Sequence, residues 1–311
     1  MIFGFTRPQA IAFAAMLAVI TLAPAVLYPV FVMEVLCLGL FAAAFNLLLG
    51  YVGLLSLGHA AYFGMGSYIG AWTVKYWGLS AELCMLAGGA VAALLGFVFG
   101  WIAIRRQGIY FAMITLALAQ MAYLFCVEAP FTGGEDGIQQ VPRAALFGLV
   151  PMHDDMALYW LIAGVFIAGF LLIHRIVHSP FGQVLKAIRE NEPRAISLGY
   201  RVDDYKLLAF VLSAALAGVA GAAKSQVFGI ATFSDVQWTM SGEVVLMVLL
   251  GGIGTIFGPV VGALVFGALE TYLARFGDWV TVAQGAIFIL CVLAFRRGIV
   301  GELGGRLRLA L

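Results

Sequence analysis

The stretch "MLAGGAVAALLGFVFGWIAIRR", residues Met85 to Arg106, decides the fold class of this chain. It carries no charged side chain before the arginine pair at its end, and it consists mainly of Leu, Ala, Val, Phe and Gly. A helix needs about 20 such residues to cross the hydrocarbon core of a bilayer. Because apolar and polar residues do not alternate along it, the stretch predicts a transmembrane helix and not a strand of a barrel.

The composition of the whole chain also predicts a membrane protein. Of its 311 residues, 63% are hydrophobic and 11% are charged, whereas a soluble domain has about 25% charged residues. The net charge of +1 creates no field that would attract nucleic acid. We therefore predict an all-α integral membrane protein in contact with the lipid bilayer and with no nucleic-acid partner.

The cysteines indicate no metal site. They lie singly in apolar runs, without the paired spacing of a metal site or a disulfide framework, at Cys37, Cys84, Cys126 and Cys291. We expect them to be small buried hydrophobic side chains. Neither a bound metal nor a cofactor is predicted.

Charged residues and Pro or Gly breaks divide the chain into about ten candidate spans. Their approximate centres are Leu17, Leu40, Gly66, Ala92, Leu118, Val165, Ala217, Leu249, Phe266 and Phe288. The run between Glu243 and Ala274 is too long for one span, and we divide it at "GGIGTIFGP", Gly251 to Pro259. The first run could instead be a signal peptide, since "APA" at Ala23 to Ala25 resembles a cleavage site. We favour a retained helix because the run exceeds the usual signal-peptide length of about 7 to 15 residues.

The distribution of Lys and Arg predicts the orientation, because these residues accumulate on the cytoplasmic side. With the N-terminus inside and ten spans, both termini are cytoplasmic, and so are 13 of the 17 basic residues: Arg7, Arg105, Arg106, Arg175, Lys186, Arg189, Arg194, Arg201, Lys206, Arg296, Arg297, Arg306 and Arg308. The other face receives Lys75, Arg143, Arg275 and Lys224, with the acidic residues Glu128, Glu135, Asp136, Asp154 and Asp155.

One long charged segment, "SPFGQVLKAIRENEPRAISLGYRVDDYK" from Ser179 to Lys206, interrupts the apolar chain on the predicted cytoplasmic side. Its residues Phe181, Val184, Leu185 and Ile188 follow the i, i+3, i+4, i+7 spacing of one helix face. Asn191 is placed as the N-cap, Pro193 in the first turn and Gly199 at the end of a second, short helix, with Asp203 or Asp204 capping the next span. Two interpretations stay open: a helix pair resting on the membrane, or a docking element for a cytoplasmic partner.

Glycine, 38 residues in all, is concentrated in "GYVGLLSLGHAAYFGMGSYIGA" (Gly50 to Ala71) and "GGIGTIFGPVVGALVFGALE" (Gly251 to Glu270). The pairs with small-xxx-small spacing are Gly66 and Gly70, Gly254 and Gly258, and Gly258 and Gly262. This spacing predicts closely packed helices. Glycines also permit broken helices, whose free backbone groups can meet a polar solute within the membrane.

Polar and glycine residues inside predicted spans are candidates for a transport pathway, because polar groups are costly there. The candidates are Asn46, Ser56, Gly58, His59, Thr115, Gly251, Gly252 and Gly254. For His59 we favour a hydrogen-bonded packing role over a ligand contact. The chain has no G-x-x-x-x-G-K-[ST], H-E-x-x-H or G-x-S-x-G motif, so we predict neither an ATP site of the P-loop kind nor an enzyme.

Several blocks in one order carry a family resemblance. They are "FNLLLGYVGLLSLGHAAYFGMGSYIGA", "RRQGIYFAMITLALAQM", "FTGGEDGIQ", "SPFGQVLKAIRENEPRAISLGYRVDDYKLLAFVLSAALAGVAGA" and "WTMSGEVVLMVLLGGIGTIFGPVVGALVFG". From about Asn46 to Gly298 the chain resembles the LivM-type permease subunits of branched-chain amino acid ABC importers. The resemblance implies one transmembrane domain over residues 1–311, with a type II ABC importer-like fold.

The resemblance also implies partners. Such a permease sits in the bacterial inner membrane beside a second, homologous permease, two cytoplasmic ATP-binding subunits and a periplasmic substrate-binding protein. ATP hydrolysis is then expected in the partner subunits. The substrates would be leucine, isoleucine and valine, although related permeases serve urea, short amides or other amino acids.

By the same resemblance, residues 177–206 form a cytoplasmic coupling loop that inserts into the ATPase. The implied contact residues are Phe181, Leu185, Arg189, Glu190, Asn191, Glu192, Pro193, Arg194, Ala195, Leu198 and Gly199. The "TGGEDG" segment implies a binding-protein face at Thr132, Gly133, Gly134 and Asp136.

Two other function classes remain as alternatives. An ion-coupled secondary transporter would also use broken glycine-rich helices, but we expect no buried Asp, Glu or Arg deep in a span to carry the coupling ion. A membrane enzyme would need a cluster of His and carboxylates near one interface, and the sequence shows none.

Overall fold

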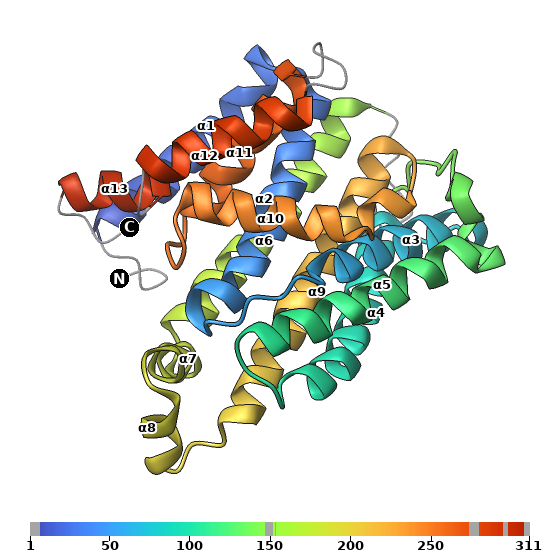
Figure 1. The fold of residues 1–311 in the computed structure, drawn as a ribbon. Coiled ribbons are helices and arrows are strands. Elements are labelled where there is room, and N and C mark those ends of the chain that lie inside the picture. Colours follow the sequence, from blue (N-terminus) through green and yellow to red (C-terminus); the bar gives the residue numbers. More distant parts are fainter. Residues whose placement is uncertain (1–6, 147–151, 153, 274–279, 295–297, 308–311) are drawn as a thin grey trace.

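The computed structural model describes residues 7–146, 152, 154–273, 280–294 and 298–307 (Figure 1). Arg275, Arg296, Arg297 and Arg308 lie outside the described residues. The α-helices are α1 (Arg7–Val26), α2 (Pro29–Tyr51), α3 (His59–Trp77), α4 (Ala81–Ala103), α5 (Ile109–Glu128), α6 (Asp155–His178), α7 (Pro180–Glu190), α8 (Glu192–Ser197), α9 (Val202–Phe228), α10 (Trp238–Gly251), α11 (Gly258–Leu273), α12 (Val280–Ala294) and α13 (Gly298–Leu307). Short 3-10 helices are η2 (Pro130–Thr132), η3 (Gly134–Asp136) and η4 (Phe233–Asp235).

The all-α class predicted from the sequence is confirmed. Over the described residues the chain is helical, and its extended pairing is an isolated bridge between Ile138 and Ala231. Each of the ten predicted span centres falls within a helix. Six helices there are long and apolar enough to cross a membrane, namely α1, α2, α4, α5, α6 and α9. The number of ten spans and the cytoplasmic position of both termini stay predictions.

The helix pair α10 and α11 differs from the prediction of two full spans. With 14 and 16 residues, the two helices are about 21 and 24 Å long, less than the hydrocarbon thickness of about 30 Å. The predicted break is confirmed, since α10 ends at Gly251 and α11 begins at Gly258. The segment between them, residues 252–257, is named the α10–α11 turn. Glycine causes the break: Gly252 and Gly254 have φ angles of 123° and 76°, which favour glycine.

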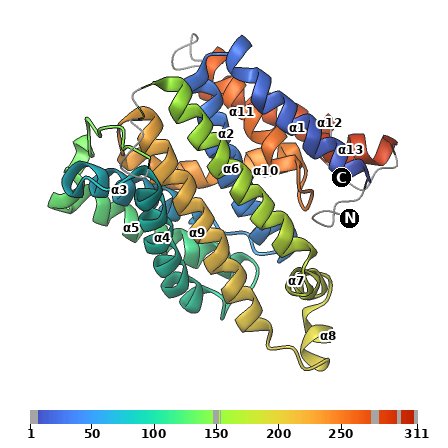
Figure 2. The ribbon, with the colours of Figure 1, turned by 180° about the vertical axis from the view of Figure 1, so that it is seen from behind.

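The centre of the molecule is formed by α2 and α9, which are buried over most of their length. Figure 2 shows α9 between α4 and α6. Within the core, α9 packs closely against α3 and α4 because small residues face one another. A Cβ atom added to Gly66 would lie 2.5 Å from the Cα atom of Gly218, and one added to Gly70 would lie 2.8 Å from the Cβ atom of Ala222. The packing role predicted for Gly66 and Gly70 is therefore confirmed.

Replacing Gly66 by Leu should destabilise the helix core. The new side chain would meet the backbone of Gly218, and overpacking of this kind costs about 1–3 kcal/mol or more. We expect a lower melting temperature of the detergent-solubilised protein. It is measured as the temperature at which half of the protein is no longer monodisperse after heating. Gly164→Leu is the matched control, because no atom of another described helix lies within 4 Å of a Cβ at Gly164. Equal melting temperatures of the two variants would contradict the packing role.

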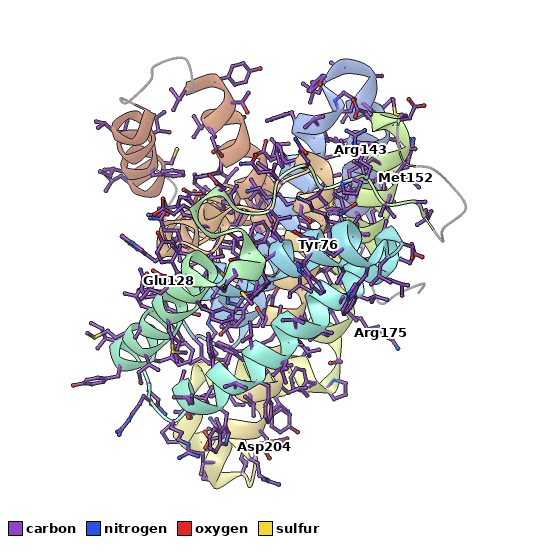
Figure 3. All side chains as sticks on the ribbon, turned by 90° about the vertical axis from the view of Figure 1, so that its right-hand side faces the viewer. Tyr76, Glu128, Arg143, Met152, Arg175 and Asp204 are labelled. Atoms are coloured by element: carbon purple, nitrogen blue, oxygen red, sulfur yellow. The ribbon has the colours of Figure 1, made fainter. Side chains whose placement is uncertain are left out.

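The helix α9 joins two polar ends of the molecule. Four residues separate its start from α8, and it ends at Phe228, next to the bridge between Ile138 and Ala231. Its 27 residues span about 40 Å. Figure 3 shows Asp204, at the start of α9, and Arg143, near the bridge, at opposite ends. The charged α7–α8 segment and the acidic loop around Asp136 are therefore separated by the whole helix bundle.

Candidate functional site

The charged segment folds as two capped helices, α7 and α8. Ser179 caps α7, with its Oγ accepting from the backbone N–H of Gly182 at 3.3 Å. Asn191 caps α8, with its Oδ1 accepting from the backbone N–H of Arg194 at 3.1 Å. Gly199 follows α8 with a φ angle of 89°, so both predicted caps of the second helix are confirmed. The cap predicted for the next span is wrong: Arg201 is the N-cap of α9, and Asp203 and Asp204 lie in its first turn.

The apolar stripe of α7 faces the protein and not a membrane surface. Leu185 and Ile188 are buried, and the ring of Phe181 stacks on that of Tyr205 in α9 with centroids 5.6 Å apart. Ile188 belongs to a small apolar cluster with Ala195 of α8. The interpretation of α7–α8 as a pair resting on the membrane through this stripe is therefore not supported. Three of the residues implied to contact an ATPase instead pack within the protein, namely Phe181, Leu185 and Ala195.

A buried ion pair fixes α8 to α9. The Nζ atom of Lys206 lies 2.6 Å from the Oε1 atom of Glu192, and the two side chains are 3% and 21% exposed. A buried ammonium group needs a charged partner, because desolvation of an unpaired charge is costly. Glu192 therefore contributes to the loop's own structure, a role that the sequence did not predict.

The outer surface of α8 carries exposed apolar side chains. Leu198 is 70% exposed, Ile196 57% and Tyr200 40%. The predicted contact residues Glu190, Asn191, Pro193 and Arg194 are exposed as well. Ile196 and Tyr200 lie within residues 177–206, the loop implied to insert into the ATPase, although they were not among its singly named contact residues. This surface, formed by the exposed residues of the segment 193–200, is named the α8 face.

Four of the predicted pathway residues meet at the α10–α11 turn. The side-chain amide of Asn46 in α2 donates to the carbonyl of Thr255 at 2.9 Å. Its Oδ1 atom accepts from the backbone N–H of Gly254 at 3.0 Å. Gly251 and Gly252 lead into the same turn. One side chain thus satisfies two backbone groups where the helix is interrupted.

Of the other predicted pathway residues, Ser56, Gly58 and His59 lie at the start of α3, and Thr115 of α5 contacts the same segment. The Oγ1 atom of Thr115 accepts from the backbone N–H of Leu57 at 3.2 Å, and the Oγ atom of Ser56 accepts from that of Gly58 at 3.4 Å. Ser241 in α10, which the sequence analysis did not single out, accepts from the N–H of Ala60 at 2.9 Å. These hydroxyl groups satisfy backbone donors at a helix start, which have no partner within the helix.

His59 is buried among aromatic rings. Its Nε2 atom lies 2.9 Å from the Oγ atom of Ser213, whose hydroxyl donates to the carbonyl of Ala44 at 2.5 Å. Because that hydroxyl proton is used, Nε2 carries the imidazole proton and donates it to Ser213. The rings of Phe41, Phe45, Tyr62 and Phe210 surround the imidazole. This geometry supports the packing role favoured for His59.

The acidic loop, residues 128–137, has one residue buried in the protein and a charged residue exposed to solvent. Thr132 is buried, and its hydroxyl lies 2.6 Å from the carbonyl of Cys126. Gly133 and Gly134 have φ angles of 81° and 63°, which favour glycine. Asp136 is exposed. Of the four residues implied to meet a binding protein, Asp136 is therefore the one that presents a charge.

A buried ion pair that the sequence did not predict lies near the same end as the acidic loop. The Nζ atom of Lys224 lies 2.6 Å from the Oδ1 atom of Asp235, whose side chain is 6% exposed. The ammonium group also lies 5.6 Å from the ring centroid of Phe63. Asp235 does not contradict the expectation of no buried acidic residue deep in a span, because it lies in the 3-10 helix η4 between α9 and α10. Its charge is already paired, so it is not a free carboxylate for a coupling ion.

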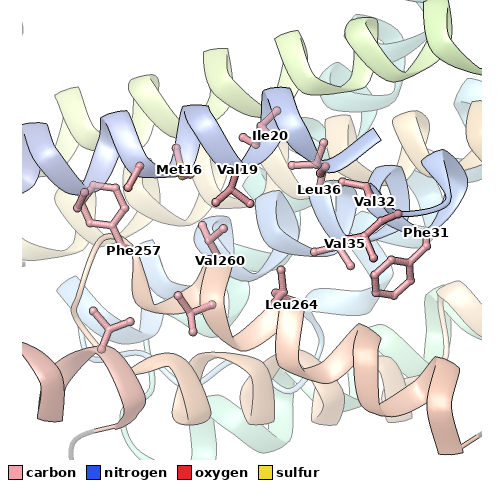
Figure 4. A pocket seen from close by; sticks show the side chains of 16 residues that line it. Met16, Val19, Ile20, Phe31, Val32, Val35, Leu36, Phe257, Val260 and Leu264 are labelled. Atoms are coloured by element: carbon pink, nitrogen blue, oxygen red, sulfur yellow. The ribbon is translucent and has the colours of Figure 1, made fainter. Parts of the chain in front are cut away.

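A cavity of about 480 Å³ lies between α1, α2 and α11 (Figure 4). Its lining is apolar and includes Met16, Leu36 and Val260. None of the predicted pathway residues lines it. An apolar lining of this kind can contact hydrocarbon chains, but it offers no hydrogen-bond or charged partner to an amino acid.

Comparison with known proteins identifies the family. The model of a family described as the permease component of the branched-chain amino acid transport system matches residues 30–293. The chain belongs to this permease family. A permease component of a transport system agrees with a multi-pass membrane protein, as the six long apolar helices of the described residues indicate. No solved structure matches the chain.

Three curated relatives are similar along most of the chain. The high-affinity branched-chain amino acid transport system permease protein LivM of Escherichia coli is 28% identical over 271 residues, which are 80% of this chain and 64% of LivM. LivH of the same organism is 26% identical over 85% of this chain and 91% of LivH. BraD of Pseudomonas aeruginosa is 25% identical over 85% of this chain and 91% of BraD. The chain thus spans 64% of the length of LivM.

Proposed function

We propose that this permease is a transmembrane subunit of an ATP-driven importer of branched-chain amino acids in the bacterial inner membrane. The observation that carries the proposal is the coupling loop, residues 177–206. Two capped helices and a buried ion pair make it a rigid body, and it presents an apolar face beyond the first residues of α9. A protein that takes its energy from a cytoplasmic partner needs such a rigid connection to its membrane helices.

The exposed surfaces fit the proposed partners. The α8 face, with Leu198 and Arg194 exposed, would insert into a groove of one ATP-binding subunit, and ATP hydrolysis would take place in the ATP-binding subunits. The loop around Asp136, at the other end of α9, would receive the periplasmic binding protein. The names LivM and LivH of its relatives support pairing with a second, homologous permease.

An ion-coupled secondary transporter is less well supported by the geometry. The buried Asp235 is neutralised by Lys224. Within the described residues, no group of three or more His, Cys, Asp or Glu side chains is arranged to hold a metal ion. Ion-coupled transporters use ionisable side chains within the membrane to carry their ion.

Competition for uptake tests the proposed substrate. Proteoliposomes containing this permease, its partner permease and both ATP-binding subunits are supplied with the binding protein and radiolabelled leucine. We expect unlabelled isoleucine and valine to reduce leucine uptake about tenfold at a hundredfold excess, because they compete for the same binding protein. Competition by urea or acetamide alone, or no leucine uptake while ATP is hydrolysed, would contradict this substrate class and favour urea or short amides.

A further inference from the structure

Arg189 in α7 is an exposed residue whose guanidinium end reaches the body of the permease. Its guanidinium group donates a hydrogen bond to the carbonyl of Gly50, in the last turn of α2. The same group lies against the α10–α11 turn, because a Cβ atom added to Gly254 would be 3.1 Å from Nη1 of Arg189. Arg189 thus touches α2 and the turn at once, whereas the family resemblance implied a contact with an ATPase.

Glycine makes this contact possible on both sides of the guanidinium group. A Cβ atom at Gly53, where φ is 83°, would lie 3.2 Å from Cγ of Arg189. A Cβ atom at Gly50 would lie 2.7 Å from the backbone nitrogen of Gly254. Larger residues at these positions would separate α7, the end of α2 and the turn.

The end of α2 continues the connection. Asn46, one helical turn before Gly50, holds the α10–α11 turn through the carbonyl of Thr255 and the N–H of Gly254. The ammonium group of Lys186 in α7 lies 5.7 Å from the ring centroid of Tyr51, which gives α2 a second contact with the loop. A displacement of α7 therefore acts directly on the residues that hold the turn.

A polar cavity gives the turn room to move. Its volume is about 440 Å³, and it is lined by Gly50, Tyr51, Lys186, Arg189, Glu190 and Gly254. It lies between α7 and the α10–α11 turn, so both elements border the same open space. The turn itself separates two short helices, and its free backbone groups are of the kind that a polar solute can meet.

We infer that Arg189 is a positioning residue that joins the coupling loop to the α10–α11 turn, and that this turn is the inner gate of the transport pathway. The inference rests on the proposed function. Motion of a docked α8 passes to α7, and the Arg189–Gly50 hydrogen bond moves the end of α2. Asn46 moves with the end of α2 and displaces the α10–α11 turn, which opens or closes the pathway.

The variant Arg189→Gln tests this inference in the assembled complex. We expect ATP hydrolysis and co-purification of the ATP-binding subunits within about twofold of the unchanged complex, while leucine uptake falls about tenfold or more, the size of a typical coupling effect. Arg189→Lys keeps the positive charge but loses the planar guanidinium group. Its leucine uptake should lie between that of Arg189→Gln and that of the unchanged complex. Arg106→Gln, an exposed arginine at the α4–α5 connection, is the matched control and should transport normally.

Labelling of the turn gives a readout that does not depend on uptake. Ile253 in the turn is 40% exposed, and Cys37, Cys84 and Cys126 are buried. In the Ile253→Cys variant with Cys291→Ser, the rate of reaction with a water-soluble maleimide should change when ATP is added. Adding Arg189→Gln should make that rate independent of ATP.

The outcomes separate the two proposals. Normal uptake by Arg189→Gln, or labelling that still responds to ATP, would overturn the role of Arg189. Loss of the ATP-binding subunits from the Arg189→Gln complex would also overturn it, and would place Arg189 at the docking surface. If the unchanged complex takes up no branched-chain amino acid, the proposed substrate fails, whereas the labelling experiment still decides the link between loop and turn.

Discussion

Replacing Glu192 by Lys should nearly abolish transport while leaving membrane insertion intact. Lys206 is 3% exposed, and Glu192 is its carboxylate partner at 2.6 Å. Breaking a buried pair by removing one partner costs about 3–5 kcal/mol, and the variant adds a second positive charge. We expect α8 to separate from α9, so that leucine uptake falls about a hundredfold, since each 1.4 kcal/mol is about a factor of ten.

Uptake into proteoliposomes measures the effect, and the amount of variant in the membrane fraction shows that insertion is unchanged. The charge-reversed double variant Glu192→Lys with Lys206→Glu should recover part of the uptake. Arg201→Gln is the matched control, because it breaks a solvent-exposed ion pair with Asp204 in which the side chains are 84% and 57% exposed; such pairs contribute about 0–1 kcal/mol. Normal uptake by Glu192→Lys would contradict the placement of the coupling loop.

Replacing Asp235 by Ala should destabilise the fold at the opposite end of α9. The change leaves Lys224 without the carboxylate that lies 2.6 Å from its ammonium group, and we expect a loss of about 3 kcal/mol of stability. The measurement is the temperature at which half of the detergent-solubilised protein aggregates, which should fall by several degrees.

A double variant distinguishes a structural from a transport role for this pair. Lys224→Met with Asp235→Ala removes both charges, and replacing a buried ion pair by apolar side chains is often neutral. We expect the melting temperature to recover. A single Asp235→Ala variant with unchanged stability would contradict the buried pair, and uptake lost in a stable double variant would show that the pair also serves transport.

Features that depend only on residues close to one another in the sequence were predictable. The centres of the spans follow from the length of apolar runs, and the caps at Asn191 and Gly199 follow from local backbone chemistry. The stripe of α7 was found because helical periodicity does not depend on the partner. Periodicity cannot say what the stripe packs against, and the structure shows that it faces α9 and α8.

Contacts between distant parts of the chain were not predictable. The partner of Asn46 is 209 residues away, and that of Arg189 is 139 residues away. The sequence therefore named Asn46 and Gly254 as pathway candidates without showing that one holds the other. The pair of Lys224 and Asp235 was missed because the two residues lie on different elements, α9 and η4.

The length rule for spans also has a limit in this chain. It gave two full spans between Glu243 and Ala274, whereas α10 and α11 have 14 and 16 residues. The glycines of the α10–α11 turn adopt φ angles that end a helix early. An apolar run that contains such glycines can hold a folded-back pair of short helices, and the run length alone does not show this.

The most direct measurement is ATP-dependent leucine uptake by the assembled complex, with and without a substitution of the P-loop lysine in its ATP-binding subunits. We predict that the substitution abolishes uptake while the complex, including this permease, still assembles. Uptake that survives the substitution at its normal rate would contradict an ATP-driven importer and would favour ion-coupled transport.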